Sequence, residues 1–165
     1  KSMAEGNRSR GTVVSEPVTA VDIPATLFSM AGLKQPWKMH GYDLSPLLED
    51  PDSPWGNPSL LVHTAKQYGS DTDSIPEKGD PKLYHGPGIP WYVLLSQGRY
   101  KYVRTLIEGE TEELYDLVSD PDELRNLAGN ANYTDLLKKY RKAAIKELRR
   151  TDAGFVDTLP SVASN

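Results

Sequence analysis

The side chains that could bind a substrate are concentrated in and around one long loop. His63 ends a predicted strand, and the loop after it, residues 65–90, contains Lys66 and His85. Loops longer than about 12 to 15 residues in a compact domain are usually either functional or mobile. A histidine at a strand end can donate a hydrogen bond to a ligand, although it can also simply cap the strand. The length of the loop therefore indicates a functional or a mobile segment.

No catalytic or metal-binding motif accompanies these residues. The histidines at positions 40, 63 and 85 lack the i, i+3 or i+4 spacing of a zinc site. The chain contains no cysteine, which excludes disulfides, thiolate metal sites and a cysteine nucleophile. No glycine-rich phosphate loop follows a predicted strand. We therefore expect no catalytic residue, metal ligand or cofactor in this chain.

Composition and charge restrict the classes of partner. The 165 residues suffice for one ordinary domain, and 13 glycines and 13 prolines indicate long connections between short elements. The net charge of −4, from 19 basic and 23 acidic residues, comes without a basic stripe, so nucleic acid is not an expected partner. No apolar run approaches the roughly 20 residues that cross a bilayer, so no membrane partner is expected. No export signal is visible, and the localisation stays unknown.

The first predicted helix covers residues 19–33. Asp22 is placed to cap it, and Ile23, Leu27 and Met30 recur at helical spacing. This apolar stripe must be buried against something. If it does not pack on a sheet of this chain, it leaves an apolar patch of the kind that marks an interface.

Downstream, the pattern predicts an α+β fold with a small four-stranded antiparallel sheet. Alternating apolar and polar residues indicate strands, and Gly98 lies in a hairpin turn between two of them. A helix is predicted to start at Asp120, because Pro121 suits its first turn and Glu123 completes a capping box. The predicted strands are residues 59–64, 91–95, 100–107 and 113–117.

The last predicted helix should cover one face of this sheet. Asn132 is placed to cap it, and its apolar positions share one face, while the basic residues on other faces, Arg141 among them, are expected to be solvated. Residues after Thr151 are expected to form an irregular tail. The apolar face consists of Tyr133, Leu136, Leu137, Tyr140, Ala144 and Leu148.

Several of these segments together resemble the end of the type I, formylglycine-dependent sulfatases of the alkaline phosphatase superfamily. They are residues 98–103 (Gly-Arg-Tyr-Lys-Tyr-Val), 113–117 (Glu-Leu-Tyr-Asp-Leu) and 120–128, with its Asp-Pro, Glu and Asn-Leu-Ala. Residues 41–48 also resemble the family's Gly-x-Ser-Leu-x-Pro-Leu-Leu, with Asp43 in place of the serine. The resemblance implies that the first helix belongs to a larger α/β domain.

The resemblance implies sulfate-ester hydrolysis by the whole enzyme, with calcium and a formylglycine made within a Cys/Ser-x-Pro-x-Arg motif. Basic side chains and the metal would stabilise charge on the sulfate oxygens. Residues 15–19 and 74–78 match the first three positions of that motif but lack its arginine. The nucleophile and the calcium site are therefore expected outside this chain, which alone should be inactive.

The resemblance implies that this chain contributes residues that line the substrate-binding side of the active site. Lys1 is followed by Glu5 and Gly6, as is the family's lysine that contacts the sulfate, and so it is a candidate for that role. The alternative is that Lys1 is a disordered terminal lysine. His63, Lys66 and His85 are the other predicted substrate-binding residues, since sulfatases place substrate-selecting residues in this region. The expected substrate is a sulfated small molecule or glycan.

The domain assignment follows from the same resemblance. Residues 1–48 are assigned to the end of the catalytic α/β domain, 49–150 to the C-terminal sulfatase subdomain and 151–165 to the tail. The expected partner is the rest of the sulfatase chain. Two alternatives stay open, a stand-alone binding module without catalysis and a fragment of a related phosphonate or phosphodiester hydrolase.

Overall fold

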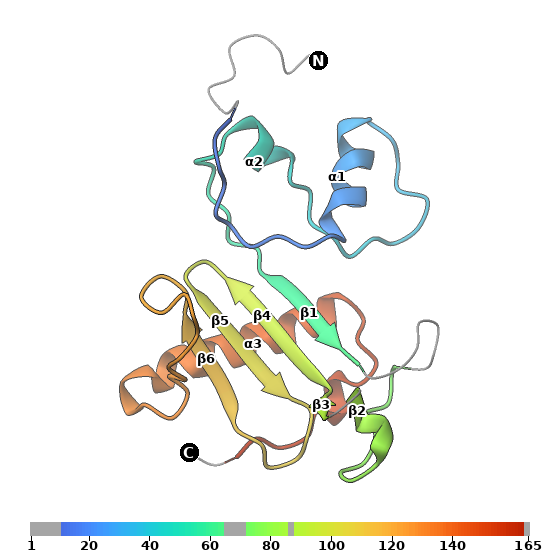
Figure 1. Ribbon diagram of the computed structural model, residues 1–165. Helices are drawn as coiled ribbons and strands as arrows, with labels where there is room; N and C mark the ends of the chain where they lie inside the picture. The colour runs from blue at the N-terminus through green and yellow to red at the C-terminus, as the bar shows by residue number, and fades with distance from the viewer. Residues whose placement is uncertain (1–10, 65–71, 86–87, 164–165) are drawn as a thin grey trace. The chain divides into compact units, whose positions relative to one another are not determined.

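The computed structural model describes residues 11–64, 72–85 and 88–163 (Figure 1). It divides into two compact units, one up to Ser59 and one from Leu60. The first unit contains two helices, α1 (Asp22–Met30) and α2 (Ser45–Glu49). No helix within the described residues is both long and apolar enough to span a membrane.

Asp22 organises the first unit, although not as the predicted helix cap. Val21 takes the cap position of α1 and makes no side-chain capping bond. The buried carboxylate of Asp22 instead accepts hydrogen bonds from the backbone amides of Thr19 and Tyr42, both at 2.7 Å. Thr26 Oγ1 accepts from the amide of Leu44 at 2.9 Å. Hydrogen bonds therefore hold the start of α1 to residues 41–44, although 18 to 20 positions separate the bonded residues in the sequence.

The predicted apolar stripe of α1 is exposed. Ile23, Leu27 and Met30 are 54%, 61% and 49% exposed, whereas the buried positions of the helix are Asp22, Ala25 and Thr26. The sequence allows this stripe either to pack on a sheet of the chain or to form an exposed apolar patch. The structure shows the exposed patch. Such patches mark interaction surfaces in soluble proteins.

The second unit is built on the predicted four-stranded antiparallel sheet. Its order is β1-β4-β5-β6, and in the central hairpin Tyr92 pairs with Thr105 and Gln97 with Tyr100. The two-residue turn needs a positive φ, and Gly98 supplies it at +54°. The strands are β1 (Ser59–His63), β4 (Tyr92–Gln97), β5 (Tyr100–Thr105) and β6 (Glu112–Asp116).

The long loop contains more regular structure than its composition predicts. A 3-10 turn, η1 (Pro81–Leu83), leads into a two-stranded sheet of β2 (Tyr84–His85) and β3 (Ile89–Pro90). Leu83 and Trp91 are fully buried, and the backbone amide of Trp91 donates to the carbonyl of Leu83 at 3.0 Å. These two apolar residues fasten the end of the loop to the core, a tertiary contact that a polar sequence window does not reveal.

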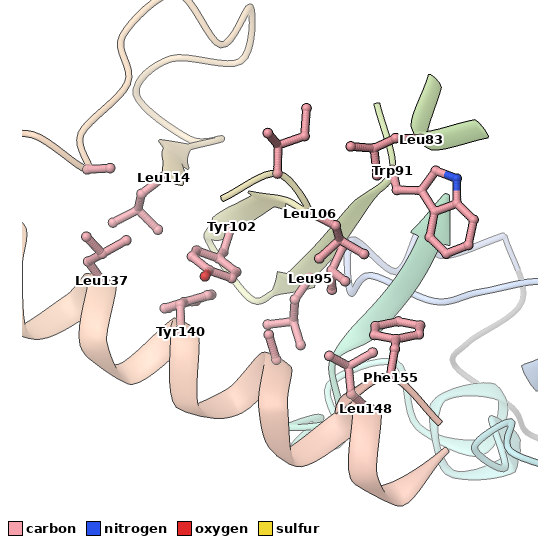
Figure 2. Close-up of a cluster of buried hydrophobic side chains, with 14 residues drawn as sticks. Leu83, Trp91, Leu95, Tyr102, Leu106, Leu114, Leu137, Tyr140, Leu148 and Phe155 are labelled. Atoms are coloured by element: carbon pink, nitrogen blue, oxygen red, sulfur yellow. The ribbon is translucent and has the colours of Figure 1, made fainter. Parts of the chain in front are cut away.

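The helix α3 (Thr134–Arg150) covers one face of the sheet, as predicted (Figure 1). Figure 2 shows Leu137, Tyr140 and Leu148 of α3 meeting side chains from the strands. Tyr140 Oη also donates to the carbonyl of Gln97 at 2.6 Å. The predicted cap is wrong: Asn132 lies inside a 3-10 turn, η2 (Ala131–Tyr133), and makes no capping bond to α3.

The helix predicted at Asp120 is absent, and residues 117–130 form turns joined by irregular segments instead. The Asp120 carboxylate accepts from the amides of Leu124 and Arg125, and Glu123 has a φ of +56° that interrupts a helix. The side chain of Asn126 accepts from the amides of Leu114 (3.1 Å) and Ala128 (2.9 Å) and donates to the carbonyl of Glu112 (3.1 Å). Hydrogen bonds between Asn126 and the edge of β6 have therefore replaced the predicted capping box of Asp120 and Glu123.

Replacing Asn126 with alanine should lower the free energy of unfolding of the second unit by about 2 to 3 kcal/mol, since three partly buried backbone groups lose their partner. Urea unfolding followed by the fluorescence of the buried Trp91, in a background with Trp37→Phe and Trp55→Phe, measures the change. Asn130→Ala is the matched control. The exposed side chain of Asn130 accepts from the amide of Asn132, and its loss should cost no more than about 1 kcal/mol. Equal effects of the two substitutions would contradict this account.

The described residues after Thr151 pack on the second unit. They include a 3-10 turn, η3 (Val156–Thr158), and a buried Phe155 (Figure 2). The carbonyl of Ser161 accepts from the amide of Gly109 at 2.9 Å, and the carbonyl of Pro160 accepts from Arg104 Nη2 at 2.6 Å. The tail therefore forms part of the folded unit.

Candidate substrate-binding site

Two of the four predicted site residues come together at the end of the sheet. The rings of His63 and His85 lie 5.8 Å apart in an edge-on arrangement, and His63 stacks on Tyr92 with ring centroids 5.0 Å apart. His63 and Tyr92 are neighbours because β1 and β4 are adjacent strands. The other two predicted residues, Lys1 and Lys66, lie outside the described residues.

The position of His85 depends on the packed end of the loop. Leu83 is buried two residues earlier, and the indole Nε1 of Trp91 donates to the carbonyl of Lys82 at 3.1 Å. The Asp80 carboxylate accepts from the amide of Lys82 at 2.8 Å and holds the 3-10 turn. These contacts place His85 beside His63, although 22 positions separate them in the sequence.

The His63 side chain has unused hydrogen-bonding capacity. Its Nε2 atom is shielded from solvent and has no hydrogen-bond partner among the described residues. Leaving a buried polar atom unpaired costs about 1 to 3 kcal/mol, so such atoms are usually satisfied by water or a ligand. His85 is exposed at the same place. The pair offers imidazole donors and one aromatic surface to a polar ligand.

No metal-binding cluster accompanies this pair among the described residues. Within the residues that the structure describes, no group of three or more histidine, aspartate or glutamate side chains could hold a metal ion. The arrangement therefore does not fit the calcium site implied by the resemblance, and we assign neither calcium nor formylglycine to these residues. The chemistry that His63 and His85 themselves supply is hydrogen bonding to a ligand.

The motif that carries the resemblance is a structural unit. Arg99 in the hairpin turn donates two hydrogen bonds to Asp116 at the end of β6, and Ser119 Oγ donates to the same carboxylate at 2.7 Å. The hydrogen bonds from Arg99 hold the pKa of Asp116 well below its usual range. Lys101 is paired with Glu123 in the turn segment that follows. These residues fix the sheet and the turn after it.

A buried polar network joins the sheet to α3. The carboxylate of Glu112 accepts hydrogen bonds from Tyr102 Oη and from Arg141, whose Nε lies 2.8 Å from Oε1. Burial by itself would raise the pKa of Glu112, but the bonds from Arg141 and Tyr102 outweigh it and lower that pKa. Burial, reinforced by the bond to Glu112, raises the pKa of Tyr102. The expectation that Arg141 is a solvated surface residue is therefore wrong.

Comparisons with known proteins place this architecture. No protein-family model matches the chain. It is 26% identical over 148 residues to an arylsulfatase of Clostridium perfringens, covering 90% of this chain and 26% of that protein. It is 32% identical over 127 residues to arylsulfatase K of Xenopus laevis, covering 73% of this chain and 20% of that protein. The chain thus spans about a fifth to a quarter of the length of these curated relatives.

Solved structures show the same fold. A phosphonate monoester hydrolase from Silicibacter pomeroyi matches 88% of the chain with a TM-score of 0.60 at 24% identity, and the match covers 28% of that chain. A 2-O GAG sulfatase matches 87% of the chain with a TM-score of 0.59 at 24% identity, covering 27% of that chain. The chain therefore shares the fold of the matched part of these structures. Its curated relatives are sulfatases, and the chain belongs to the sulfatase family and corresponds to its C-terminal portion.

Proposed function

We propose that this chain is the C-terminal part of a sulfuric ester hydrolase, in which it closes one side of the active site and helps to select the substrate. The observation that carries the proposal is the meeting of His63, His85 and Tyr92 at the end of a sheet of sulfatase type. Without a nucleophile motif in its sequence, the chain alone is expected to be inactive. Hydrolysis would need the remainder of the enzyme.

The chemistry of the pair suits a sulfated ligand. A sulfate ester presents anionic oxygens that only accept hydrogen bonds, and histidine donates from both ring nitrogens when it is protonated. Hydrogen bonds to a charged group contribute about 1.5 to 3 kcal/mol, more than bonds between neutral groups. A sugar ring adds hydroxyl groups and an apolar face that a tyrosine can contact. A sulfated glycan is therefore the substrate class favoured here, with Lys1 and Lys66 as further proposed contacts.

The exposed face of α1 supports a partner within the same enzyme. Ile23, Leu27 and Met30 present an apolar stripe, and Trp37 nearby in sequence is 67% exposed. An exposed face with this composition is costly in water and is normally covered. We propose that the rest of the sulfatase chain covers it. A stand-alone binding module would instead need polar residues at these positions.

The test uses the complete protein that contains this chain, assayed on sulfated glycans and on a small aryl sulfate. His63→Ala and His85→Ala should each raise KM for the preferred glycan about tenfold, which corresponds to about 1.4 kcal/mol of lost binding. The kcat and the KM for the aryl sulfate should change little. Lys82→Ala is the control, since this exposed cation lies on the same segment and contributes hydrogen bonds through its main chain.

Unchanged KM values for every sulfated substrate in both histidine variants would show that His63 and His85 do not select the substrate.

A second candidate reaction follows from the structural likeness to a phosphonate monoester hydrolase, whose TM-score is 0.60. The same assay therefore includes a phosphonate monoester and a phosphodiester. Faster turnover of these esters than of any sulfate ester would replace the sulfatase proposal by this alternative.

A further inference from the structure

The tail residue Gly154 is held firmly between α3 and the core. The amide of Ala153 donates to the carbonyl of Leu148 at 2.9 Å. Asp152, the residue before Ala153, has a φ of +57°. On the other side, the side chain of Phe155 is only 4% exposed and lies in the core cluster (Figure 2). The backbone at Gly154 therefore has little freedom to move.

The side chain of Asp73 lies directly against this backbone. A Cβ atom at Gly154 would lie 2.6 Å from Cγ and Oδ1 of Asp73 and 2.7 Å from its Cβ. Contacts under 3.0 Å are not found for real Cβ atoms, so any residue larger than glycine must displace Asp73. Rotation about χ1 cannot relieve the contact, because the Cβ of Asp73 is itself too close. Gly154 has no positive φ, so the space occupied by Asp73 is what requires glycine here.

Asp73 is the second residue of the described loop segment 72–85, which ends at His85. Further along this segment, Ile75 packs partly buried on the core, and Lys78 Nζ donates to the carbonyl of Glu108 at 2.9 Å. Leu83 then enters the core. The segment 72–85 is thus attached to the second unit at several points, of which the contact with the tail is the first.

We propose that Gly154 is a positioning residue: by accepting Asp73 against its backbone, the C-terminal tail sets the place of the loop segment 72–85. Its consequence for substrate binding rests on the proposed function, because His85 lies at the end of this segment. Gly154 itself touches no substrate in this proposal. The C-terminal tail would thereby help to determine substrate specificity through the position of His85.

Amide hydrogen exchange of the complete protein tests the proposal without any assay of activity. In Gly154→Ala, amides in residues 72–83 should exchange at least about threefold faster, since local opening of the displaced segment becomes easier. Amides of α3 should be unchanged, which shows that the unit is folded. Gly129→Ala is the matched control. A Cβ at Gly129 meets no heavy atom of the described residues within 4 Å, and exchange in 72–83 should stay at the wild-type rate.

A second variant keeps the test decisive if the alanine disturbs the tail itself. Asp73→Gly removes the side chain that the new methyl group would displace, so adding Gly154→Ala to it should cause no further increase in exchange. Exchange in 72–83 that is unchanged in Gly154→Ala, or equally raised by that substitution in both backgrounds, overturns the positioning role. Faster exchange in Gly154→Ala alone with an unchanged KM supports positioning and counts against the proposed function of the loop.

Discussion

Replacing Gly41 with alanine should disrupt the first unit and lower its stability by more than about 4 kcal/mol, in the range of severe backbone and packing defects. The new Cβ would lie 1.9 Å from the carbonyl oxygen of Val21, 2.5 Å from its carbon and 2.7 Å from the Cα of Asp22. All three atoms belong to the backbone at the start of α1. A side-chain rotation therefore cannot make room for the methyl group.

The clash falls on the contact that organises the unit. Moving residues 41–44 away from α1 breaks the bond from the amide of Tyr42 to Asp22 and the bond from the amide of Leu44 to Thr26. The buried Asp22 carboxylate would lose one of its two backbone donors. An ionised carboxylate that loses a buried partner is costly, which adds to the steric effect.

Hydrogen exchange of the α1 amides measures this prediction, with the β4 and β5 amides of the second unit as an internal reference. Gly56→Ala provides the control within the same unit, since a Cβ there meets no described heavy atom within 4 Å and its φ is not positive. We expect a change below about 1 kcal/mol for Gly56→Ala. Wild-type protection of α1 in Gly41→Ala would show that the close approach of Gly41 to Val21 is not required.

Replacing Glu112 with alanine should lower the stability of the second unit by about 3 kcal/mol, the lower end of the cost of breaking a buried ion pair from one side, because Arg141 is partly exposed. Glu112 is 4% exposed, and its loss leaves Arg141 and the neighbouring, 8% exposed Arg104 without this carboxylate. Tyr102 Oη also loses its acceptor. Urea unfolding followed by Trp91 fluorescence, with Trp91 as the only tryptophan, measures the change. Glu113→Ala, on the other face of β6, should cost less than about 1 kcal/mol.

The same residue should make stability depend on pH. The folded-state pKa of Glu112 is lowered, so the carboxylate binds its proton less readily in the folded than in the unfolded chain. Its stabilisation is therefore complete above the unfolded pKa of about 4.3 and is lost as the pH falls through the folded value. Glu112→Gln should show a smaller loss of stability than wild type between about pH 5 and pH 3. An identical acid dependence in the two proteins would rule out Glu112 as a source.

The sequence alone determined the parts of this protein that depend on local periodicity. Residues alternate between the core and the other face along β4, β5 and β6, with Gly98 at the turn between the first two. The apolar face of α3 recurs every three to four residues and is buried as its pattern predicts. Such patterns are readable because each residue's side of a strand or helix follows from its position in the sequence. The resemblance to the sulfatases rests on the same segments.

Tertiary structure decided the polar partners. Asp120 and Glu123 form a valid capping box in sequence, but Asn126 finds backbone partners on the edge of β6, and the helix does not form. Asp22 likewise binds the distant amide of Tyr42. A polar side chain can pair with any donor or acceptor that the fold brings within reach, and its sequence neighbours do not limit that choice.

The candidate site belongs to the same category. The sequence places His63 and His85 around the loop, but their contact depends on the adjacency of β1 and β4 and on the burial of Leu83. The approach of Asp73 to Gly154 has no local signal, because a glycine required by a distant side chain looks like any other glycine in the sequence. Periodicity records which face of an element is buried. Only the folded chain fixes which elements, and therefore which polar groups, meet.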